Sequence, residues 1–306
     1  MPICLTNLNN ILTSSRSNDF AHGRYSSFRP TYPSSLYDTI LDYHHGPRKV
    51  ALDLGTGHGL VARELSKRFD QVHASDPSPG MLQLAQQITG ESTSGSSNNN
   101  ISFHASTAES SSQFLASESV DLVTAAQAVH WFDYDKMWPD LSRVVRPGGT
   151  VAFWGYTDPI VVSYPRASAL LSQYAESMDP TLLGPYWQQP GRAIVQGKLR
   201  AVQPPALQWV DTLRVEYEPR TGEGVRFLRK AMTLADVAEF VRTWSAYHGW
   251  LGRWRDDQTR WRKDEGGPGD VVDDLLSKMI EEEPGLVDDG LVELEWGTGL
   301  VLTRRA

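Results

Sequence analysis

The sequence predicts an α/β fold: helices cover both faces of a doubly wound, mostly parallel sheet, and further helices form a lid. From Lys49 to Tyr156, short apolar runs alternate with helical stretches, a pattern typical of parallel strands buried on both faces. A glycine-rich turn follows the first apolar run, Val50 to Leu54, and an acidic residue, Asp76, ends the second. Ligands of such sheets bind at the carboxyl ends of the strands, so both features predict a ligand site there.

The composition is that of an ordinary globular protein. Hydrophobic residues make up 40% and charged residues 22% of the 306 residues, enough for a full core. A net charge of −8 argues against a nucleic-acid partner, because phosphate binding depends on clustered Lys and Arg.

The single cysteine, Cys4, excludes an intramolecular disulfide and a cysteine zinc site. The first basic side chain is Arg16 and no apolar run reaches membrane-spanning length, so we expect a cytoplasmic protein without a metal or a membrane partner. The oligomeric state stays open.

The glycine-rich turn indicates which kind of cofactor binds. Gly55, Gly57 and Gly59 alternate as G-x-G-x-G between the first strand and the following helix, where small residues let the backbone approach a ligand. Dinucleotide folds instead use G-x-G-x-x-G to bring a pyrophosphate to a helix N-terminus. Asp53, two residues before the first glycine, would repel that group but can order the loop amides and attract a cationic ligand. The turn therefore favours S-adenosylmethionine over NAD, with Asp76 accepting the ribose hydroxyls.

Further motifs follow in order along the chain. They are Asp76-Pro77-Ser78-Pro79-Gly80-Met81-Leu82, Thr107-Ala108-Glu109, Val120 to Thr124 with Gln127 to Phe132, and Arg146 to Thr150. With these motifs the chain resembles the class I S-adenosylmethionine-dependent methyltransferases, in particular the methyltransferase-11 branch with its trans-aconitate methyltransferases and fungal small-molecule methyltransferases. The resemblance covers most of the chain. It implies a seven-stranded Rossmann-like sheet, S-adenosylmethionine as the cofactor and S-adenosylhomocysteine as the product.

The resemblance also implies where the adenosine lies. Pro77 and Met81 follow the second-strand aspartate, and Met81 is expected to pack against the adenine. Thr107, Ala108 and Glu109 are expected to face the adenine edge.

Three more residues have two possible roles each. Gln127, at the carboxyl end of the fourth strand, either caps that strand or contacts the methionine part of the cofactor. Tyr25 and Arg29 either pin the N-terminal segment onto the domain or close over the cofactor, with Arg29 or Arg24 pairing with its carboxylate.

The pattern along the chain predicts four segments. Residues 1–48 form an N-terminal lid, in which Pro30 and Pro33 prevent one continuous helix, so that a helix begins near Ser34. Residues 49–156 form the S-adenosylmethionine-binding core. Residues 157–285 form a mainly helical substrate lid with strand six near 206–218, and residues 286–306 form a C-terminal strand that completes the sheet. Gly297-Thr298-Gly299 suggests a bend or hairpin in that last strand.

The acceptor side of the site is predicted from His130 and the aromatic residues. His130 follows strand four, where it can orient or deprotonate the acceptor. Trp131, Trp154, Tyr247 and Trp250 are the candidates for the acceptor pocket, since aromatic faces can also stabilise a sulfonium.

The expected reaction is methyl transfer to an oxygen of a small organic acceptor, a carboxylate as in trans-aconitate-type acids. Two alternatives remain at this point. One is O- or N-methylation of a secondary metabolite with His130 as general base, and the other is a protein that binds S-adenosylmethionine without transferring its methyl group.

Overall fold

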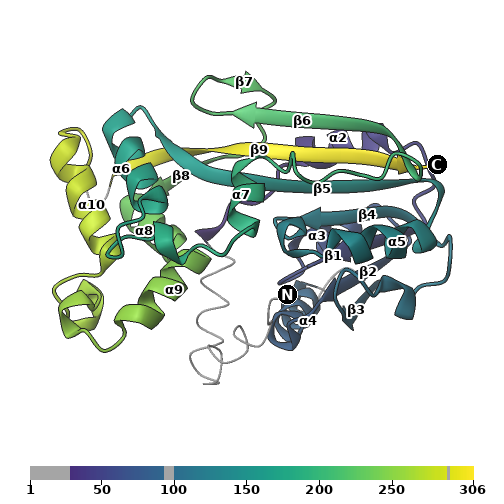
Figure 1. Cartoon of the computed structure of the whole chain (residues 1–306), viewed down its shortest axis with the longest axis horizontal. Coiled ribbons are helices and arrows are strands. Elements are labelled where there is room, and N and C mark those ends of the chain that lie inside the picture. The colour runs from purple at the N-terminus through teal and green to yellow at the C-terminus, as the bar shows by residue number, and fades with distance from the viewer. Residues whose placement is uncertain (1–27, 93–99, 288–289) are drawn as a thin grey trace. The chain divides into compact units, whose positions relative to one another are not determined.

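The computed structural model describes residues 28–92, 100–287 and 290–306, which fold into two compact units (Figure 1). The sheet unit comprises residues 31–162, 188–230 and 293–306. The helical unit comprises, among the described residues, 28–30, 163–187 and 231–292. Each unit therefore combines segments that are far apart in the sequence.

The strands form one twisted sheet in the order β3-β2-β1-β4-β5-β9-β6-β7. Strands β1 to β5 pair in parallel, and the chain reverses its winding direction between β1 and β4, as a doubly wound fold requires. The strands are β1 (Val50–Leu54), β2 (Gln71–Asp76), β3 (Ile101–Ala105), β4 (Val120–Ala126), β5 (Val145–Val162), β6 (Trp209–Glu218), β7 (Glu223–Gly224), β8 (Arg229–Thr233) and β9 (Leu291–Arg305). The predicted α/β fold is confirmed, and β1 to β6 with β9 supply the seven strands that the resemblance implies.

Helices of the sheet unit cover its parallel strands. They are α2 (Ser34–Tyr43), α3 (Leu60–Leu65), α4 (Pro79–Ser92), α5 (Tyr134–Val144) and α7 (Gly191–Gln196), with 3₁₀ turns η2 (Ser111–Gln113) and η3 (Val129–Trp131). Helix α2 begins directly after Pro33, where the helix was predicted, because proline has no N–H to give to a preceding turn.

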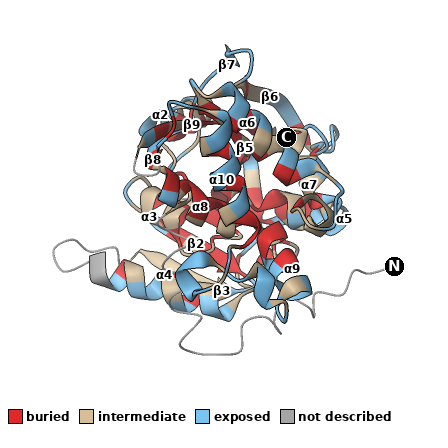
Figure 2. Cartoon of the chain, turned by 90° about the vertical axis from the view of Figure 1, so that its left-hand side faces the viewer, coloured by how far each residue is buried: buried red, intermediate tan, exposed pale blue. Residues whose placement is uncertain are grey.

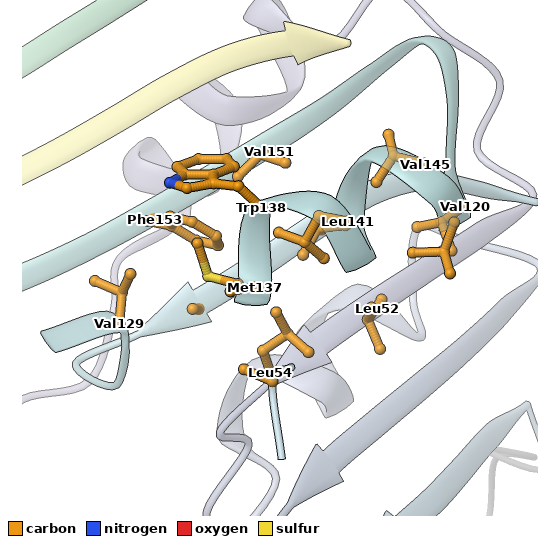
Figure 3. Packing of buried hydrophobic residues seen from close by; sticks show 14 of the residues in the cluster. Leu52, Leu54, Val120, Val129, Met137, Trp138, Leu141, Val145, Val151 and Phe153 are labelled. Carbon is orange, nitrogen blue, oxygen red and sulfur yellow. The ribbon is translucent and has the colours of Figure 1, made fainter. Parts of the chain in front are cut away.

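The core of the sheet unit lies between α5 and the central strands. Figure 3 shows Met137, Trp138 and Leu141 of α5 facing Leu54 and Phe153 of the strands. The central strands carry near-continuous buried runs, such as all seven positions of β4 except the last, because helices cover both faces of a parallel sheet. Buried residues accordingly colour the central strands red in Figure 2.

The C-terminal strand differs from the prediction. β9 runs as one strand from Leu291 to Arg305 and pairs antiparallel with both β5 and β6, so a hairpin at Gly297-Thr298-Gly299 is wrong. The register with β5 shifts at Gly297, between the pairs Tyr156–Thr298 and Pro159–Trp296. Gly299 serves close packing instead: a Cβ there would collide with the backbone of Lys198. β5 also continues to Val162, past the predicted end of the core at residue 156.

The helical unit is built around α6 (Pro165–Glu176), α8 (Leu234–Arg242), α9 (Ser245–Trp254) and α10 (Val271–Glu282). Short 3₁₀ turns connect them: η4 (Gly184–Tyr186), η5 (Gln258–Arg260) and η6 (Lys263–Glu265). Capping boxes start α8 at Thr233 and α10 at Asp270, which satisfies the first amides of each helix. Within the described residues, no helix combines the length and the apolar character needed to cross a bilayer.

An ion-pair network holds α8 and α10 together. The Arg242 guanidinium lies 3.0 Å from Asp270, 2.8 Å from Asp273 and 2.9 Å from Glu239. The Tyr247 hydroxyl donates to the same Asp270 carboxylate at 2.7 Å. Because Asp270 is 2% exposed, this network satisfies charges that would otherwise be buried alone.

Candidate active site

The carboxyl ends of the parallel strands carry the predicted cofactor residues, and hydrogen bonds join them. Asp53 lies near the end of β1 and Asp76 ends the neighbouring strand β2, two positions beyond Ala74, the register partner of Asp53. The Thr56 amide donates to the Ser75 carbonyl at 2.9 Å, which attaches the glycine turn to β2. This arrangement results from the parallel register, which brings the ends of neighbouring strands to one edge.

The glycine turn has the backbone conformation that its sequence requires. Gly55, Gly57 and Gly59 have φ angles of +61°, +55° and +80°, in the left-handed region that side chains with a Cβ rarely adopt. A Cβ on Gly57 would meet no atom within 4 Å, so this glycine borders open space. A Cβ on Gly55 would lie 2.6 Å from the Ala128 Cβ, on the segment that follows β4. The turn is therefore closed toward the sheet and open at Gly57, where a ligand can approach the backbone.

Asp76 orders the loop and keeps acceptor capacity. One carboxylate oxygen accepts from the Gly57 amide and the other from the Ser78 amide, each at 2.9 Å. Burial raises the pKa of Asp76, while these two amides lower it. A carboxylate offers about four acceptor positions, so two remain for ribose hydroxyls. These residues fit an adenosine-containing cofactor.

Asp53 has partners that the sequence analysis missed. Its carboxylate accepts from the Thr56 hydroxyl at 2.6 Å and from the Thr124 hydroxyl at 2.8 Å. Asp53 also accepts a backbone hydrogen bond from Ala62 on α3, while the loop amide of Gly57 bonds to Asp76. Thr124 is a polar residue inside the apolar run of β4, and this position in the sequence could have pointed to a buried hydrogen-bond partner. It is the register partner of Asp53.

Burial raises the pKa of Asp53 to about 6, and the negative charge of Asp76 adds to the effect. The hydroxyls of Thr56 and Thr124 oppose it by stabilising the ionised form. Asp53 therefore changes its charge state in mildly acidic solution.

The segment after β3 is tied to the same edge. The Ser106 amide donates to the Asp76 carbonyl at 3.3 Å, which brings Thr107 and Ala108 to the end of β2. Ala108 is buried in the core cluster, and the Glu109 carboxylate accepts from the Asp133 amide at 2.8 Å. Pro77 is exposed and Met81, on the first turn of α4, is half-buried. Contacts of these residues with adenine stay a prediction.

Gln127 caps the fourth strand. It has a φ angle of +51°, unusual for a residue other than glycine. Its side-chain amide donates to the Tyr156 carbonyl at 3.0 Å and its side-chain oxygen accepts from the Tyr156 amide at 2.7 Å. The side chain thus continues the pairing of β4 with β5, which is the first of its two predicted roles. A contact with the methionine part of the cofactor stays a prediction.

His130 and Trp131 lie on η3, directly after β4. Their rings are 4.7 Å apart, and Trp131 is 52% exposed, a large exposed area for a tryptophan. Helix α7 supports this turn from one side, since a Cβ on Gly191 would lie 3.2 Å from both rings. Arg192, on α7, forms an ion pair with Asp158 on β5 that fixes the helix in place.

The four pocket candidates are not equivalent. Trp131 is exposed, whereas Trp154 is 2% exposed and packs edge-on against Tyr32 and Tyr37 at 5.3 and 6.2 Å. Tyr247 and Trp250 belong to the helical unit, where both are buried and stack with ring centroids 6.2 Å apart.

The N-terminal candidates are only partly described. Tyr25 and Arg24 lie outside the described residues. Arg29 donates to the Thr243 hydroxyl at 3.2 Å and to the Thr243 carbonyl at 2.9 Å, at the end of α8 in the helical unit. This contact fits the predicted pinning role, and a cofactor contact of Arg29 stays a prediction.

Comparisons with known proteins agree with this site. A family model described as a methyltransferase domain matches residues 52–153, the segment that carries the glycine turn and Asp76. The chain is 30% identical to the probable S-adenosylmethionine-dependent methyltransferase CRG1 of Saccharomyces cerevisiae over 96% of this chain and 98% of that protein. It is 32% identical to the methyltransferase cfoB of Aspergillus candidus over 63% of this chain and 62% of that protein.

The fold has a solved counterpart as well. The structure of a proposed type II methyltransferase from Anaeromyxobacter dehalogenans covers 91% of this chain and 98% of its own, with a TM-score of 0.66 and 23% identity. Together with the full-length yeast relative and the geometry of the glycine turn, these findings show that the chain belongs to the class I S-adenosylmethionine-dependent methyltransferases.

Proposed function

We propose that this methyltransferase transfers a methyl group to a carboxylate oxygen of a small organic acid in the cytoplasm. The observation that supports a carboxylate acceptor is the state of the predicted site carboxylates. Asp53 accepts from two hydroxyls, Asp76 from two amides and Glu109 from one amide. Each of these carboxylates already accepts hydrogen bonds from the protein, so it is poorly suited to remove a proton from an acceptor. An organic acid arrives already ionised at neutral pH and needs no strong base.

The chain's own residues bind and orient the reactants. Asp76 and the open face of Gly57 would hold the adenosine side of the cofactor. When bound, S-adenosylmethionine supplies an electrophilic methyl group on its sulfonium. The protein then aligns the acceptor oxygen and excludes water, effects that can contribute about 7–11 kcal/mol when the geometry is near attack. In this proposal His130 and Trp131 orient the acceptor.

A second candidate rests on the position of His130. Its imidazole follows β4 and lies beside an exposed tryptophan, where it could accept a proton from a phenol, hydroxyl or amine. Methylation of such a group on a secondary metabolite would make His130 a general base.

The deciding experiment is a transfer assay with an isotopically labelled methyl donor and two matched panels of acceptors. One panel contains small di- and tricarboxylic acids, including trans-aconitate, and the other contains phenols, alcohols and amines of similar size. We expect labelled methyl esters from the first panel, identified by product mass. Labelled ethers or amines from the second panel alone would overturn the proposal in favour of the second candidate.

A further inference from the structure

The two carboxylates of the cofactor site are buried without a cationic partner. Asp53 is 1% exposed and accepts hydrogen bonds from two threonine hydroxyls and one backbone amide. Asp76 is 9% exposed and accepts from two loop amides. Within the described part of the chain, all of these partners are neutral donors, so the negative charges of both side chains are not balanced by an ion pair.

The other buried carboxylates of the described residues do have cationic partners. Those of Asp121, Asp270 and Glu295 each form an ion pair with an arginine. Such pairing is expected, because a buried charge without a partner is unfavourable. Asp53 and Asp76 differ from these three residues, and both lie where a ligand is expected. The missing positive charge is therefore one that a ligand can supply.

The donor and the product of the reaction differ in charge at one atom. S-adenosylmethionine has a sulfonium, whereas S-adenosylhomocysteine has lost the methyl group and, with it, that positive charge. The adenosine, amino and carboxylate groups of the two ligands are identical, so contacts with those groups do not distinguish them. Buried negative charges can act on a sulfonium without touching it, because charges inside a protein interact over longer distances than charges in water.

We infer that the unpaired buried charge of Asp53, together with that of Asp76, makes the site select the cationic methyl donor over the neutral product. Asp76 is also expected to bind the ribose, which both ligands share, so Asp53 is the residue that tests the effect of charge alone. Loss of the sulfonium charge during the reaction then favours release of the product. The inference concerns cofactor binding and does not depend on which acceptor is methylated.

The test compares three ligands by calorimetry near pH 7.5. They are S-adenosylmethionine, S-adenosylhomocysteine and sinefungin, an analogue with an ammonium group in place of the sulfonium. We expect both cationic ligands to bind the wild type about tenfold more tightly than S-adenosylhomocysteine, since the effective dielectric constant inside a protein is low. Asp53→Asn keeps an acceptor for the threonine hydroxyls but has no charge. In this variant the preference should fall to about twofold or less, with little change in the affinity for S-adenosylhomocysteine.

Asp121→Asn is the matched control. Asp121 is 3% exposed, and its carboxylate accepts from the amides of Lys49 and Val50, for which asparagine keeps an acceptor. It lies near the start of β4, whereas the cofactor residues lie at the carboxyl ends of the strands. We expect Asp121→Asn to keep the preference for the cationic ligands. An equal loss of preference in Asp121→Asn and Asp53→Asn would contradict a specific effect of Asp53.

The wild type alone provides a second measurement if Asp53→Asn does not fold. Burial raises the pKa of Asp53 to about 6, so its carboxylate takes up a proton below that pH. The titratable groups that face it are Asp76 on β2 and Tyr37 on α2, while α3 and β4 present neutral donors. Burial raises the pKa of Tyr37 above its usual value, so Tyr37 stays neutral, and protonation of Asp76 would act in the same direction as that of Asp53. The preference for both cationic ligands should therefore decrease between about pH 7.5 and 5.

Three results would overturn the inference. One is equal weakening of all three ligands in Asp53→Asn, which would indicate a structural role. The others are a wild type that binds S-adenosylhomocysteine as tightly as the two cations, and a preference that does not change with pH. Failure of the wild type to bind any of the three ligands would contradict the cofactor site itself, and the inference with it.

Discussion

At the scale of single residues, Asp76 combines two functions, since its carboxylate orders two loop amides and keeps two acceptor positions. We predict that Asp76→Ala weakens binding of S-adenosylmethionine and S-adenosylhomocysteine, because hydrogen bonds to a charged acceptor contribute about 1.5–3 kcal/mol. Calorimetry measures the loss. Asp140→Asn is the control, since Asp140 also accepts a backbone amide, that of Ser112, at 3.2 Å. Unchanged affinity in Asp76→Ala, or tight NAD binding by the wild type, would contradict the assignment.

His130 distinguishes the two acceptor chemistries. For a carboxylate acceptor we expect His130→Ala to lose positioning only, and His130→Gln to recover much of the rate through a replacement hydrogen bond. For a phenol or hydroxyl acceptor, loss of a general base costs about 10²–10⁴-fold in rate, and glutamine cannot replace it. The measurement is a pH–rate profile of the wild type and both variants. A steep rise through the histidine range that disappears in His130→Gln would support the general-base enzyme instead.

At the scale of elements, the ion-pair network between α8 and α10 stabilises the helical unit. We predict that Arg242→Met lowers the free energy of unfolding by about 3–5 kcal/mol, because it leaves the buried carboxylate of Asp270 and the half-buried carboxylate of Asp273 without their cation. Urea denaturation measures this loss. Arg200→Met removes an ion pair with Glu216 whose arginine is 66% exposed and should change stability by less than about 1 kcal/mol. Equal losses of unfolding free energy in Arg242→Met and Arg200→Met would show that burial does not make the network more stabilising than an exposed ion pair.

The elements of the sheet were predictable from the sequence to different degrees. The parallel strands and the glycine turn were evident because both depend on local patterns, apolar runs and closely spaced glycines. Thr124 as the partner of Asp53 was not, because the two residues are 71 positions apart and meet only through the register of β1 and β4. The capping role of Gln127 was open for the same reason, since its bonds reach Tyr156 on the next strand. The hairpin predicted in β9 is wrong because Gly299 allows close packing against the Lys198 backbone, which the sequence does not reveal.

At the scale of the whole molecule, a histidine pair and a single carboxyl group, Asp53, have opposite effects on the stability in acid. His73 on β2 and His104 on β3 have ring nitrogens 2.9 Å apart, so at least one ring is neutral. Burial, with His104 as the second cause, lowers the pKa of His73 to about 4, and burial also lowers that of His104. In the unfolded chain a histidine takes up its proton near pH 6.5. The unfolded state therefore binds more protons between about pH 6.5 and 4, so stability falls as the pH is lowered through that window.

Asp53 has the opposite effect: it makes the folded state more stable as the pH falls. Its raised pKa of about 6 means that the folded state takes up a proton before the unfolded chain does, which favours folding as the pH falls from 6 toward 3.8. We predict that His73→Gln flattens the loss of stability between pH 6.5 and 4, and that Asp53→Asn makes this loss steeper. Urea midpoints at several pH values for the wild type and both variants measure the two effects. Parallel curves for all three proteins would show that neither group controls the response to acid.

The division of the chain into two units also limits how this protein can evolve. The backbone passes from one unit to the other after Pro30, Val162, Trp187, Lys230 and Val292. A gene segment that encodes either unit alone therefore does not exist as one continuous piece. Recombination cannot exchange the helical unit as a block, and a protease that cuts one crossing releases neither unit. New versions of the helical unit must arise through point substitutions and changes in segment length inside an unbroken reading frame.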